Sequence, residues 1–327
     1  MTGIFLTSVQ RAASSVNKMG LLHNFYARAK PWVAARFYYA LSPISPVLTS
    51  RILYWRKFKY PLNLHSPQTL NEKLMWLKLY EYGQSPLVSQ CADKLRVRDY
   101  VSAAGWGNIL NELYGAWDSV AQIPWNQLPD SFVLKCNHGC GFNVICPDKH
   151  VLDITRSRAR LNQWMRTDFW RFYAELQYRS IPKRIVCERY LGGQGRLPED
   201  YKVYCFHGVP QYILVCEGRS VGKPRFYFFD TGWHFCPLTR DGLSEPEDFT
   251  LERPVCLPEM LKCAAELSAP FPFVRADFYV TEGRLVFGEL TFTPSGALDT
   301  DRLPETDRLL GSFLTIPVAA KNETRQR

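Results

Sequence analysis

The chain has 327 residues, of which 46% are hydrophobic and 22% are charged, so it can bury a substantial core and form two or three lobes. Its best candidate for a membrane-spanning helix, residues 37–48, contains two prolines and is shorter than the roughly 18 residues that a span requires. Ten scattered cysteines in apolar surroundings indicate reduced, buried thiols in a cytoplasmic protein, and we expect no signal peptide.

The excess of positive charge lies near the N-terminus. Residues 1–71 contain nine Lys or Arg and no Asp or Glu, whereas residues 72–327 contain 31 residues of each sign. Aromatic and aliphatic residues alternate with these cations, so residues 1–65 are predicted to form a basic, amphipathic helical arm. The arm suits an anionic membrane, contacted through residues 1–60, or an acidic polymer; an equal alternative is a basic face packed on the body. Nucleic-acid binding is not expected, because no recognisable module accompanies the charge.

A folded domain is predicted to begin near residue 66. Residues 69–72 have the spacing of a capping box, and the leucines that follow at helical spacing predict a helix that Gly83 ends. A second helix is predicted over residues 86–105, because Ser-Pro precedes it and apolar residues recur along it. A first subdomain, 66–130, is completed by a short segment at 109–117 and a loop at 123–130.

The next part of the chain is richer in strands. Residues 132–136 and 144–146 are predicted strands on either side of a glycine-bearing loop at 137–141. Residues 155–177 have a helical, aromatic pattern, and residues 185–190 form a further strand. These elements make up a predicted subdomain at 131–191.

Residues 192–312 are predicted to form a third subdomain, followed by a tail at 313–327. One hairpin pairs 201–206 with 211–216, and another pairs 273–279 with 284–291 across Glu282-Gly283. A strand at 226–229 and a helix at 257–267 lie between the two hairpins. The fold class is therefore α+β with mixed, mainly antiparallel sheets, preceded by the basic arm.

Arg275, Asp277 and Glu289 form the sharpest candidate site. In the second hairpin, Asp277 and Glu289 project from neighbouring strands, close enough to share a hard cation such as Mg²⁺ that holds nucleotide phosphates. Two carboxylates among apolar strand residues are costly unless something compensates them. On spacing alone, a carboxylate pair neutralised by Arg275 is the favoured alternative.

Four pieces of sequence occur in a fixed order: residues 92–96, 133–141, 185–191 and the hairpin that contains Arg275, Asp277 and Glu289. Together they resemble the ATP-grasp superfamily. The chain is most similar to the TupA-like branch, which is named for teichuronopeptide biosynthesis. That likeness covers about residues 60–300 and lies in TLNEKLMWLKLY at 69–80, FVLKCNH at 132–138, DYK at 200–202 and GELTFTP at 288–294.

The resemblance implies an ATP-grasp fold that binds ATP and Mg²⁺. Lys94 and Lys135 would contact the phosphates, and the loop 137–141 would close over them with its backbone amides. Glu188 would lie at a strand edge beside the adenine. The implied nucleotide contacts are Lys94, Lys135, His138, Gly139, Gly141, Glu188, Tyr190, Leu191, Asp200 and Lys202.

The resemblance also implies that Asp277, Glu289 and Thr291 hold the metal, while Arg275 steadies the charge that develops at the acyl centre. Thr291 departs from the Asn that many ATP-grasp ligases have at this position, and we interpret it as a variation of the TupA-like branch. The loop 293–296 would face the acceptor.

The implied activity is that of an ATP-dependent carboxylate–amine ligase, which forms an acyl phosphate during cell-surface polysaccharide or glycopeptide biosynthesis. Its partner would be a carboxylate-bearing glycan or an amino-acid acceptor, and it would act in the cytoplasm, at the inner face of the plasma membrane. The alternatives are a sugar kinase with the same nucleotide site, a non-catalytic scaffold for glycan assembly, and a membrane-surface glycosyltransferase, for which no convincing Asp-x-Asp motif is found.

Cys136, His138 and Cys140 are soft metal ligands that lie close together in the sequence. Alternate strand positions and a tight loop seldom bring such ligands onto one zinc, and no CxxC pair accompanies them, so zinc is not expected. A nucleophilic Cys140 or His138 lacks an identifiable partner, and steric or hydrogen-bonding roles in the loop are favoured.

Overall fold

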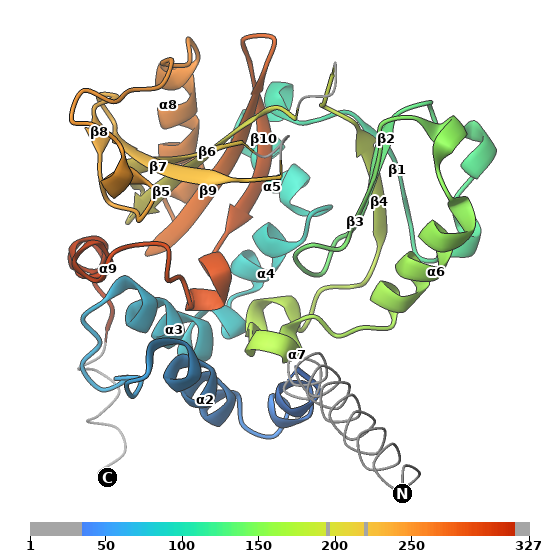
Figure 1. Ribbon diagram of the computed structural model, residues 1–327. Coiled ribbons are helices and arrows are strands. Elements are labelled where there is room, and N and C mark those ends of the chain that lie inside the picture. The colour runs from blue at the N-terminus through green and yellow to red at the C-terminus, as the bar shows by residue number, and fades with distance from the viewer. Residues whose placement is uncertain (1–34, 194–196, 219–221, 318–327) are drawn as a thin grey trace, which may run out of the picture.

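The computed structural model describes residues 35–193, 197–218 and 222–317, and two antiparallel sheets dominate this part of the chain (Figure 1). The strands are β1 (Leu113–Trp117), β2 (Phe132–Cys136), β3 (Asn143–Cys146), β4 (Ile185–Arg189), β5 (Glu199–Phe206), β6 (Val209–Glu217), β7 (Arg225–Asp230), β8 (Phe235–Cys236), β9 (Phe273–Thr281) and β10 (Arg284–Thr291). The smaller sheet has the order β1-β4-β2-β3, and the larger sheet has the order β10-β9-β5-β6-β7-β8. The predicted α+β class with antiparallel hairpins is confirmed.

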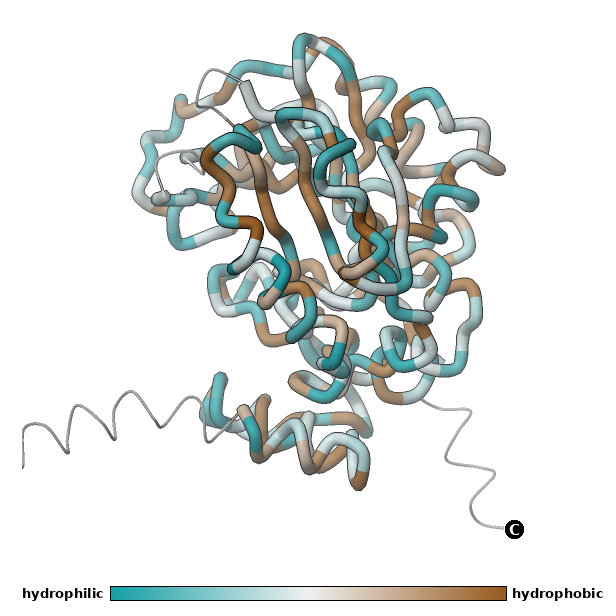
Figure 2. The backbone as a smooth tube through the Cα atoms, turned by 90° about the vertical axis from the view of Figure 1, so that its right-hand side faces the viewer, coloured by the Kyte–Doolittle hydropathy of each residue, from teal (hydrophilic) through white to brown (hydrophobic). Residues whose placement is uncertain are grey.

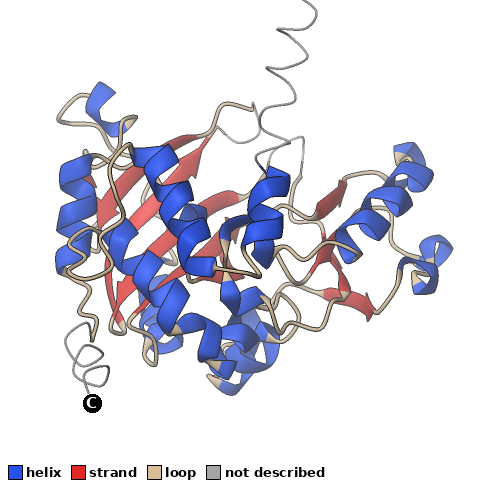
Figure 3. Cartoon of the chain, turned by 90° about the horizontal axis from the view of Figure 1, so that it is seen from below, coloured by secondary structure: helices blue, strands red, loops and turns tan. Residues whose placement is uncertain are grey.

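Helices pack on both sheets and between them. They are α2 (Pro46–Phe58), α3 (Leu70–Tyr80), α4 (Pro86–Ala92), α5 (Val97–Ala103), α6 (Ile154–Met165), α7 (Trp170–Tyr173), α8 (Leu257–Ser268) and α9 (Pro304–Ser312). In Figure 1, α6 lies on the outer side of the smaller sheet, and α4 and α5 lie between the two sheets. Figure 3 shows further helices covering the larger sheet when the molecule is seen from below.

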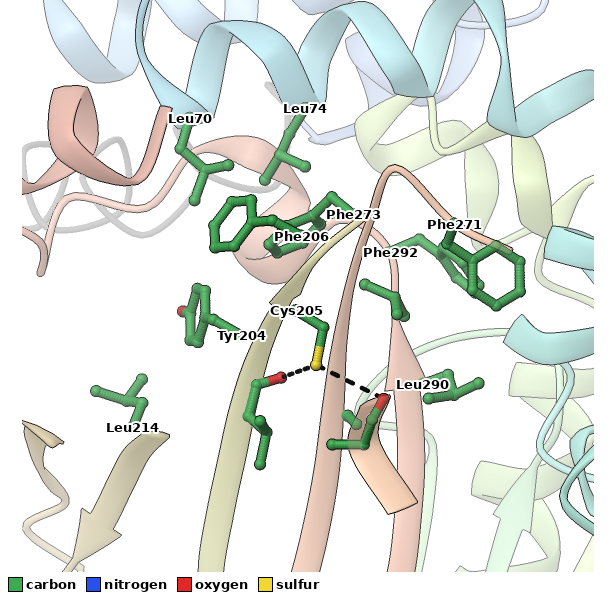
Figure 4. Packing of buried hydrophobic residues seen from close by; sticks show 14 of the residues in the cluster. Leu70, Leu74, Tyr204, Cys205, Phe206, Leu214, Phe271, Phe273, Leu290 and Phe292 are labelled. Carbon is green, nitrogen blue, oxygen red and sulfur yellow. Dashed lines mark hydrogen bonds between the residues drawn. The ribbon is translucent and has the colours of Figure 1, made fainter. Parts of the chain in front are cut away.

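Helix α3 begins at the predicted capping box. The Thr69 hydroxyl accepts a hydrogen bond from the backbone N–H of Glu72, and the Glu72 carboxylate accepts one from the backbone N–H of Thr69, both at 3.2 Å. Leu70 and Leu74 are fully buried, and their side chains point toward the aromatic rings at the end of the larger sheet (Figure 4). The helix is thereby fixed against the sheet that carries the candidate site.

Each sheet has its own hydrophobic core, and the strands that face the viewer in Figure 2 are largely apolar. Val120 and Ile123, which lie upstream of residue 131, also pack in the core of the smaller sheet. None of the ten cysteines forms a disulfide, and eight are buried, as the sequence predicts. The Cys205 thiol, for example, lies against backbone carbonyls of Val203 and Ala264 (Figure 4).

The described part of the N-terminal arm packs on the body of the protein. Tyr54 of α2 is fully buried, and Leu62 and Leu64 join the core of the larger sheet. For these residues, the alternative that the arm packs on the body therefore holds. Residues 1–34 of the predicted arm lie outside the described part. Across the described ranges, every helix is too short or too polar to cross a membrane.

The prediction of one helix over residues 86–105 is wrong. Helix α4 ends at Ala92, because Asp93 has an extended backbone and its carboxylate accepts a hydrogen bond from the N–H of Leu95 at 2.9 Å. Helix α5 begins only at Val97, so Lys94 lies in the break between the two helices. The stretch 155–177 is likewise divided, into α6, α7 and a short 3₁₀ turn, and α9 was not predicted.

Helix α9 crosses the start of α3 at Gly311. A Cβ atom at this position would lie 2.4 Å from the carbonyl oxygen of Gln68 and 2.8 Å from the backbone nitrogen of Leu70. We expect Gly311→Ala to lower the free energy of unfolding by about 1–3 kcal/mol, because backbone must move to admit the methyl group. Urea denaturation measures this change. Ser312→Ala at the exposed neighbouring position is the control, with an expected change within about 0.5 kcal/mol, and equal effects of the two substitutions would contradict the close contact.

Candidate functional site

Two carboxylates face each other on the larger sheet. Asp277 of β9 pairs directly with Glu289 of β10, and the ladder is irregular between Phe287 and Glu289. Gly288 lies in this irregularity, and a Cβ atom there would come within 2.8 Å of the carbonyl oxygen of Asp277. Directly opposed residues project from the same face of a sheet, so the hairpin brings the two predicted metal ligands together.

Arg275 lies on the same face and holds Asp277 with two hydrogen bonds. Its Nε and Nη2 atoms lie 2.7 and 2.6 Å from the two carboxylate oxygens. Thr291 pairs with Arg275 in the ladder, and its hydroxyl donates to Glu289 at 3.0 Å. The predicted catalytic and metal residues therefore form one hydrogen-bonded group.

Lys94 reaches this group from the break between α4 and α5. Its Nζ atom lies 3.3 Å from Glu289 Oε2 and donates to the carbonyl oxygen of Gly139 at 2.9 Å. The charge of Lys94, supported by Arg275 and Lys202 against the opposing effect of burial, lowers the pKa of Glu289 to about 2. Glu289 is therefore ionised at neutral pH, as a metal ligand must be.

Asn137 joins three segments beneath the glycine-bearing loop. Its fully buried amide donates to the Asp93 carboxylate at 2.8 Å and to the carbonyl oxygen of Pro182 at 2.9 Å. Its side-chain oxygen accepts a hydrogen bond from the backbone N–H of Arg184 at 2.7 Å. The Asn137 amide thus fixes both the start of the loop and the Asp93 carboxylate, which ends α4 just before Lys94.

The loop 137–141 can offer a ligand its backbone more readily than its side chains. The ring of His138 is buried, and its Nε2 atom lies 3.2 Å from the carbonyl oxygens of both Trp164 and Thr167. Gly139 approaches Phe169 so closely that a Cβ would overlap it, and Gly141 has a positive φ of 76° in open space. Any nucleotide contact of this loop would therefore come through backbone amides, for which glycines suit close approach.

The soft ligands of this loop do not converge. Cys136 is buried in the core of the smaller sheet, the ring of His138 faces carbonyl oxygens, and Cys140 lines a cavity near Glu289. In the parts of the chain that the structure describes, no cluster of three or more His, Cys, Asp or Glu side chains could hold a metal.

Lys135 and Glu188 lie on adjacent strands of the smaller sheet. Lys135 Nζ is 2.6 Å from Glu188 Oε2, and Arg98 of α5 lies 3.4 Å from the other carboxylate oxygen. Glu188 pairs with Leu113 on one side and Val133 on the other, so β4 is an interior strand. The expectation that Glu188 lies at a strand edge is therefore wrong, because β1, unrecognised in the sequence, covers that edge.

The remaining predicted nucleotide residues lie around these two groups. Asp200 and Lys202 form an ion pair at 2.7 Å on β5, and Lys202 Nζ also lies 3.4 Å from Asp277. Tyr190 and Leu191 follow the end of β4 and line a separate cavity of about 920 Å³ beside the β9–β10 turn. Asp200 and Lys202 thus join the carboxylate pair, whereas Tyr190 and Leu191 do not.

A cavity of about 740 Å³ opens beside Arg275, Glu289 and Thr291. Glu175 and Thr293 also line it, and the Thr293 hydroxyl donates to Glu175 at 2.5 Å. The backbone is strained here, since the non-glycine residues Ser295 and Ala297 have a positive φ. Strain of this kind is concentrated at functional sites.

Lys78 lies buried behind the wall of this cavity. Its ammonium donates to the carbonyl oxygen of Tyr173 at 2.8 Å, and burial lowers its pKa to about 8 against the opposing charge of Glu175. Burial in turn raises the pKa of Glu175, and the Thr293 hydrogen bond and the Lys78 charge oppose the rise. The two buried groups therefore depend on each other.

The donor set at the carboxylate pair fits Mg²⁺ bound together with phosphates. Mg²⁺ prefers hard oxygen ligands and usually takes one or two carboxylates plus substrate phosphates, rather than an all-protein cage. Asp277, Glu289 and Thr291 offer two carboxylates and one hydroxyl on adjacent strands. Lys94 and Lys202 lie close enough to share the negative charge of phosphates.

Sequence reasoning missed several charged residues of the site. Arg98 pairs with Glu188 from α5, and the charges of Lys78 and Glu175 influence each other although 97 positions separate them in the sequence. No motif marks Glu175. Lys78 lies within the LNEKLMWLKLY segment, and its spacing from the buried leucines of α3 could have indicated that this lysine is buried.

The family model described as TupA-like ATPgrasp matches residues 72–315. No curated protein matches the chain. Among solved structures, it is similar to D-alanine–D-alanine ligase from Bacillus anthracis complexed with ATP, with 14% identity, a TM-score of 0.43, and coverage of 73% of this chain and 68% of that chain.

Two further solved structures have lower TM-scores. N5-carboxyaminoimidazole ribonucleotide synthetase from Thermus thermophilus has 9% identity and a TM-score of 0.37, covering 63% of this chain and 46% of that chain. L-amino acid ligase from Bacillus licheniformis has 13% identity and a TM-score of 0.37, covering 67% of this chain and 42% of that chain.

We expect Lys78→Met to lower the free energy of unfolding by about 3–5 kcal/mol near pH 8, because it removes the buried Lys78 charge that opposes the rise in the pKa of Glu175. The folded-state pKa of Glu175 is already raised and would rise further, so the cost should shrink toward pH 5, where the folded protein takes up a proton at this carboxyl. Urea denaturation at both pH values measures the change.

The double variant Lys78→Met/Glu175→Gln is the matched control, since it removes both charges. Its stability should exceed that of Lys78→Met by at least about 1 kcal/mol near pH 8. The two charges are not coupled if Lys78→Met lowers the free energy of unfolding equally at both pH values and lowers it equally when position 175 is Gln.

Proposed function

The chain belongs to the TupA-like ATP-grasp family, and from this premise we propose that it is an ATP-dependent carboxylate–amine ligase. The observation that carries the proposal is the opposed pair of Asp277 and Glu289, with Thr291 beside them and Arg275 and Lys94 in contact. Two acids and a hydroxyl surrounded by cations suit a magnesium-bound polyphosphate. In this assignment, residues 131–191 form the nucleotide-loop subdomain and residues 192–312 the metal-binding subdomain.

In the first step, an oxygen of the substrate carboxylate attacks the γ-phosphorus, and the bond to the bridging oxygen of ADP breaks. The products are an acyl phosphate and ADP. Asp277, Glu289 and Thr291 would hold Mg²⁺, which supplies charge neutralisation at the phosphates when bound. Lys94 and Lys135 would bind phosphate oxygens, and the amides of loop 137–141 would cover them.

In the second step, the amine nitrogen attacks the acyl carbon. The carbon–oxygen bond to phosphate breaks, phosphate leaves with the electron pair, and the proton that the amine loses passes to the departing phosphate as the amide forms. Arg275 would stabilise the oxyanion of the tetrahedral intermediate, for which a guanidinium fixed in place by two hydrogen bonds is well suited. Loop 293–296 would face the acceptor.

Glu188, Tyr190 and Leu191 would lie near the base of the nucleotide, with Asp200 and Lys202 near its ribose or phosphates. The side chain of Glu188 is already neutralised by Lys135 and Arg98, so its part would be to hold Lys135 in place. Tyr190 and Leu191 would contact the base through the backbone that follows β4.

The acid or amine is proposed to be a carboxylate-bearing glycan or an amino acid, used in cell-surface polysaccharide or glycopeptide synthesis. The lining of the 740 Å³ cavity supports such a substrate. Phe172 and Tyr173 line it together with Thr293, Ser295 and Thr300, and a lining of aromatic and hydroxyl-bearing residues suits sugar rings and their hydroxyl groups.

Calorimetric titration with ATP in the presence of Mg²⁺ tests the nucleotide site. We expect the wild type to bind, and Asp277→Asn and Glu289→Gln each to weaken metal-dependent binding at least about tenfold, because each removes a charged ligand of the metal. Glu247→Gln, at an exposed carboxylate away from the carboxylate pair and from the proposed nucleotide contacts, is the matched control and should bind like the wild type. A folded wild type that binds no nucleotide overturns the ligase proposal.

We also propose that the protein acts in the cytoplasm, bound at the inner face of the plasma membrane. Leu48 and Trp55 of α2 are 47% and 56% exposed, and they lie with the half-buried Ile52 on one outward stripe of the helix. Arg51 and Lys59 flank this stripe, and Lys59 Nζ lies 5.7 Å from the centre of the Trp55 ring. Apolar side chains beside cations suit an anionic bilayer.

Co-sedimentation with vesicles tests this contact. The protein should sediment with vesicles that contain phosphatidylserine and remain in solution with phosphatidylcholine alone, and Trp55→Ser should lower the bound fraction several-fold. Val255→Ser, at an exposed valine on another part of the surface, is the control and should bind like the wild type. Equal binding to both kinds of vesicle would contradict an electrostatic membrane contact.

A further inference from the structure

The 740 Å³ cavity extends from the reacting groups to α2. Arg275, Glu289 and Thr291 line it, and so do Arg56 and Lys57. The family model matches the chain only from residue 72, so the α2 side of the cavity comes from outside the matched interval. Properties of this wall therefore belong to this chain and do not follow from the family match.

The acidic side chains around the cavity mostly have partners already. Glu289 has Lys94 at 3.3 Å, Asp299 has Arg302 at 2.7 Å, and the buried Glu175 accepts a hydrogen bond from the Thr293 hydroxyl. Arg302 is thus committed to Asp299, and Lys94 is already assigned to Glu289 and the nucleotide phosphates, so neither is left over for an acceptor.

Arg56 and Lys57 are different. Within the described ranges, no carboxylate lies within salt-bridge distance of either side chain, and residues 35–71 contain no Asp or Glu at all. Asp301 also lines the cavity. The α2 wall is thus positive, and the lining of the same cavity includes a carboxylate.

The Arg56 guanidinium is held in place by Tyr38. Its Nη1 atom donates to the Tyr38 hydroxyl at 2.5 Å, and its central carbon lies 5.6 Å from the centre of the Tyr38 ring. Tyr38 itself is buried. One N–H group is used in this contact, which leaves further donors of the planar guanidinium for a carboxylate or phosphate.

We propose that Arg56 and Lys57 form an anion subsite for the acceptor. The acceptor is an amino sugar or amino acid that carries a carboxylate or phosphate on the side away from the reacting amine. That anion binds at α2 while the amine points toward Arg275 and Glu289, and Asp301 faces the hydroxyl or ammonium groups between them. The inference rests on the proposed ligase function, since that function supplies the reacting end of the cavity.

Three amino sugars test the subsite by calorimetric titration of the full chain: glucosamine, glucosamine 6-phosphate and muramic acid, which carries a carboxylate. The wild type should bind one of the two anionic sugars about tenfold or more tighter than glucosamine, because a charge-assisted pair of hydrogen bonds is added. Whether the phosphate or the carboxylate gives the gain identifies the source of the anion.

The double variant Arg56→Gln/Lys57→Gln should lose this preference and bind all three sugars alike. Arg51→Gln, which removes a cation from the outward face of the same helix, is the matched control and should keep the preference. Arg51, Arg56 and Lys57 are all exposed, so both variants should remain folded, which thermal unfolding checks. Equal affinity of the wild type for all three sugars, or a preference that persists in the double variant, overturns the subsite.

The titrations are run with and without a magnesium complex of a non-hydrolysable ATP analogue. The analogue should bind equally to the wild type and to both variants, because Arg56 and Lys57 lie outside the proposed nucleotide contacts. A wild type that prefers an anionic sugar but binds no nucleotide retains the subsite and loses the ligase proposal. A wild type that binds nucleotide but shows no preference among the sugars retains the ligase proposal and loses the subsite.

Discussion

The opposition of Asp277 and Glu289 across the β9–β10 ladder is the constraint on which the rest of the site depends. The two carboxylates can lie side by side only because Gly288 occupies the irregularity before Glu289, where a Cβ would meet the carbonyl oxygen of Asp277. Two ionised groups in this position repel each other, and each is stabilised by a cation of its own. Arg275 holds Asp277, and Lys94 holds Glu289. The register of one hairpin therefore creates the need for both cations.

Lys94 also couples the two sheets. It comes from the break between α4 and α5, binds Glu289 of the larger sheet, and donates to the carbonyl oxygen of Gly139 in the β2–β3 loop of the smaller sheet. The break exists because Asp93 turns its carboxylate to the following amides, and Asn137 fixes that carboxylate from the base of the same loop. A movement of the loop relative to the larger sheet would change the environment of Lys94 directly.

Local signals in the sequence predicted the hairpin and the capped helix, because a turn at Glu282-Gly283 and a capping box at Thr69 act within a few residues. They failed where a distant residue decides the conformation. The break at Asp93 depends on Asn137, and the interior position of β4 depends on pairing with β1. The same holds for the residues of the site. Those of the hairpin were predictable from spacing and resemblance, whereas Arg98, Glu175 and Arg56 reach the site only through tertiary packing.

The charges of the site divide into two positive regions. Around the carboxylate pair and β4, five cations accompany four carboxylates, namely Lys94, Arg98, Lys135, Lys202 and Arg275 with Glu188, Asp200, Asp277 and Glu289. This small surplus favours a magnesium–nucleotide complex, which carries net negative charge. A second anion placed beside those phosphates would be repelled. Binding an anionic acceptor in the same cavity therefore requires a separate pair of cations at a distance from the phosphates, and α2 supplies one with Arg56 and Lys57.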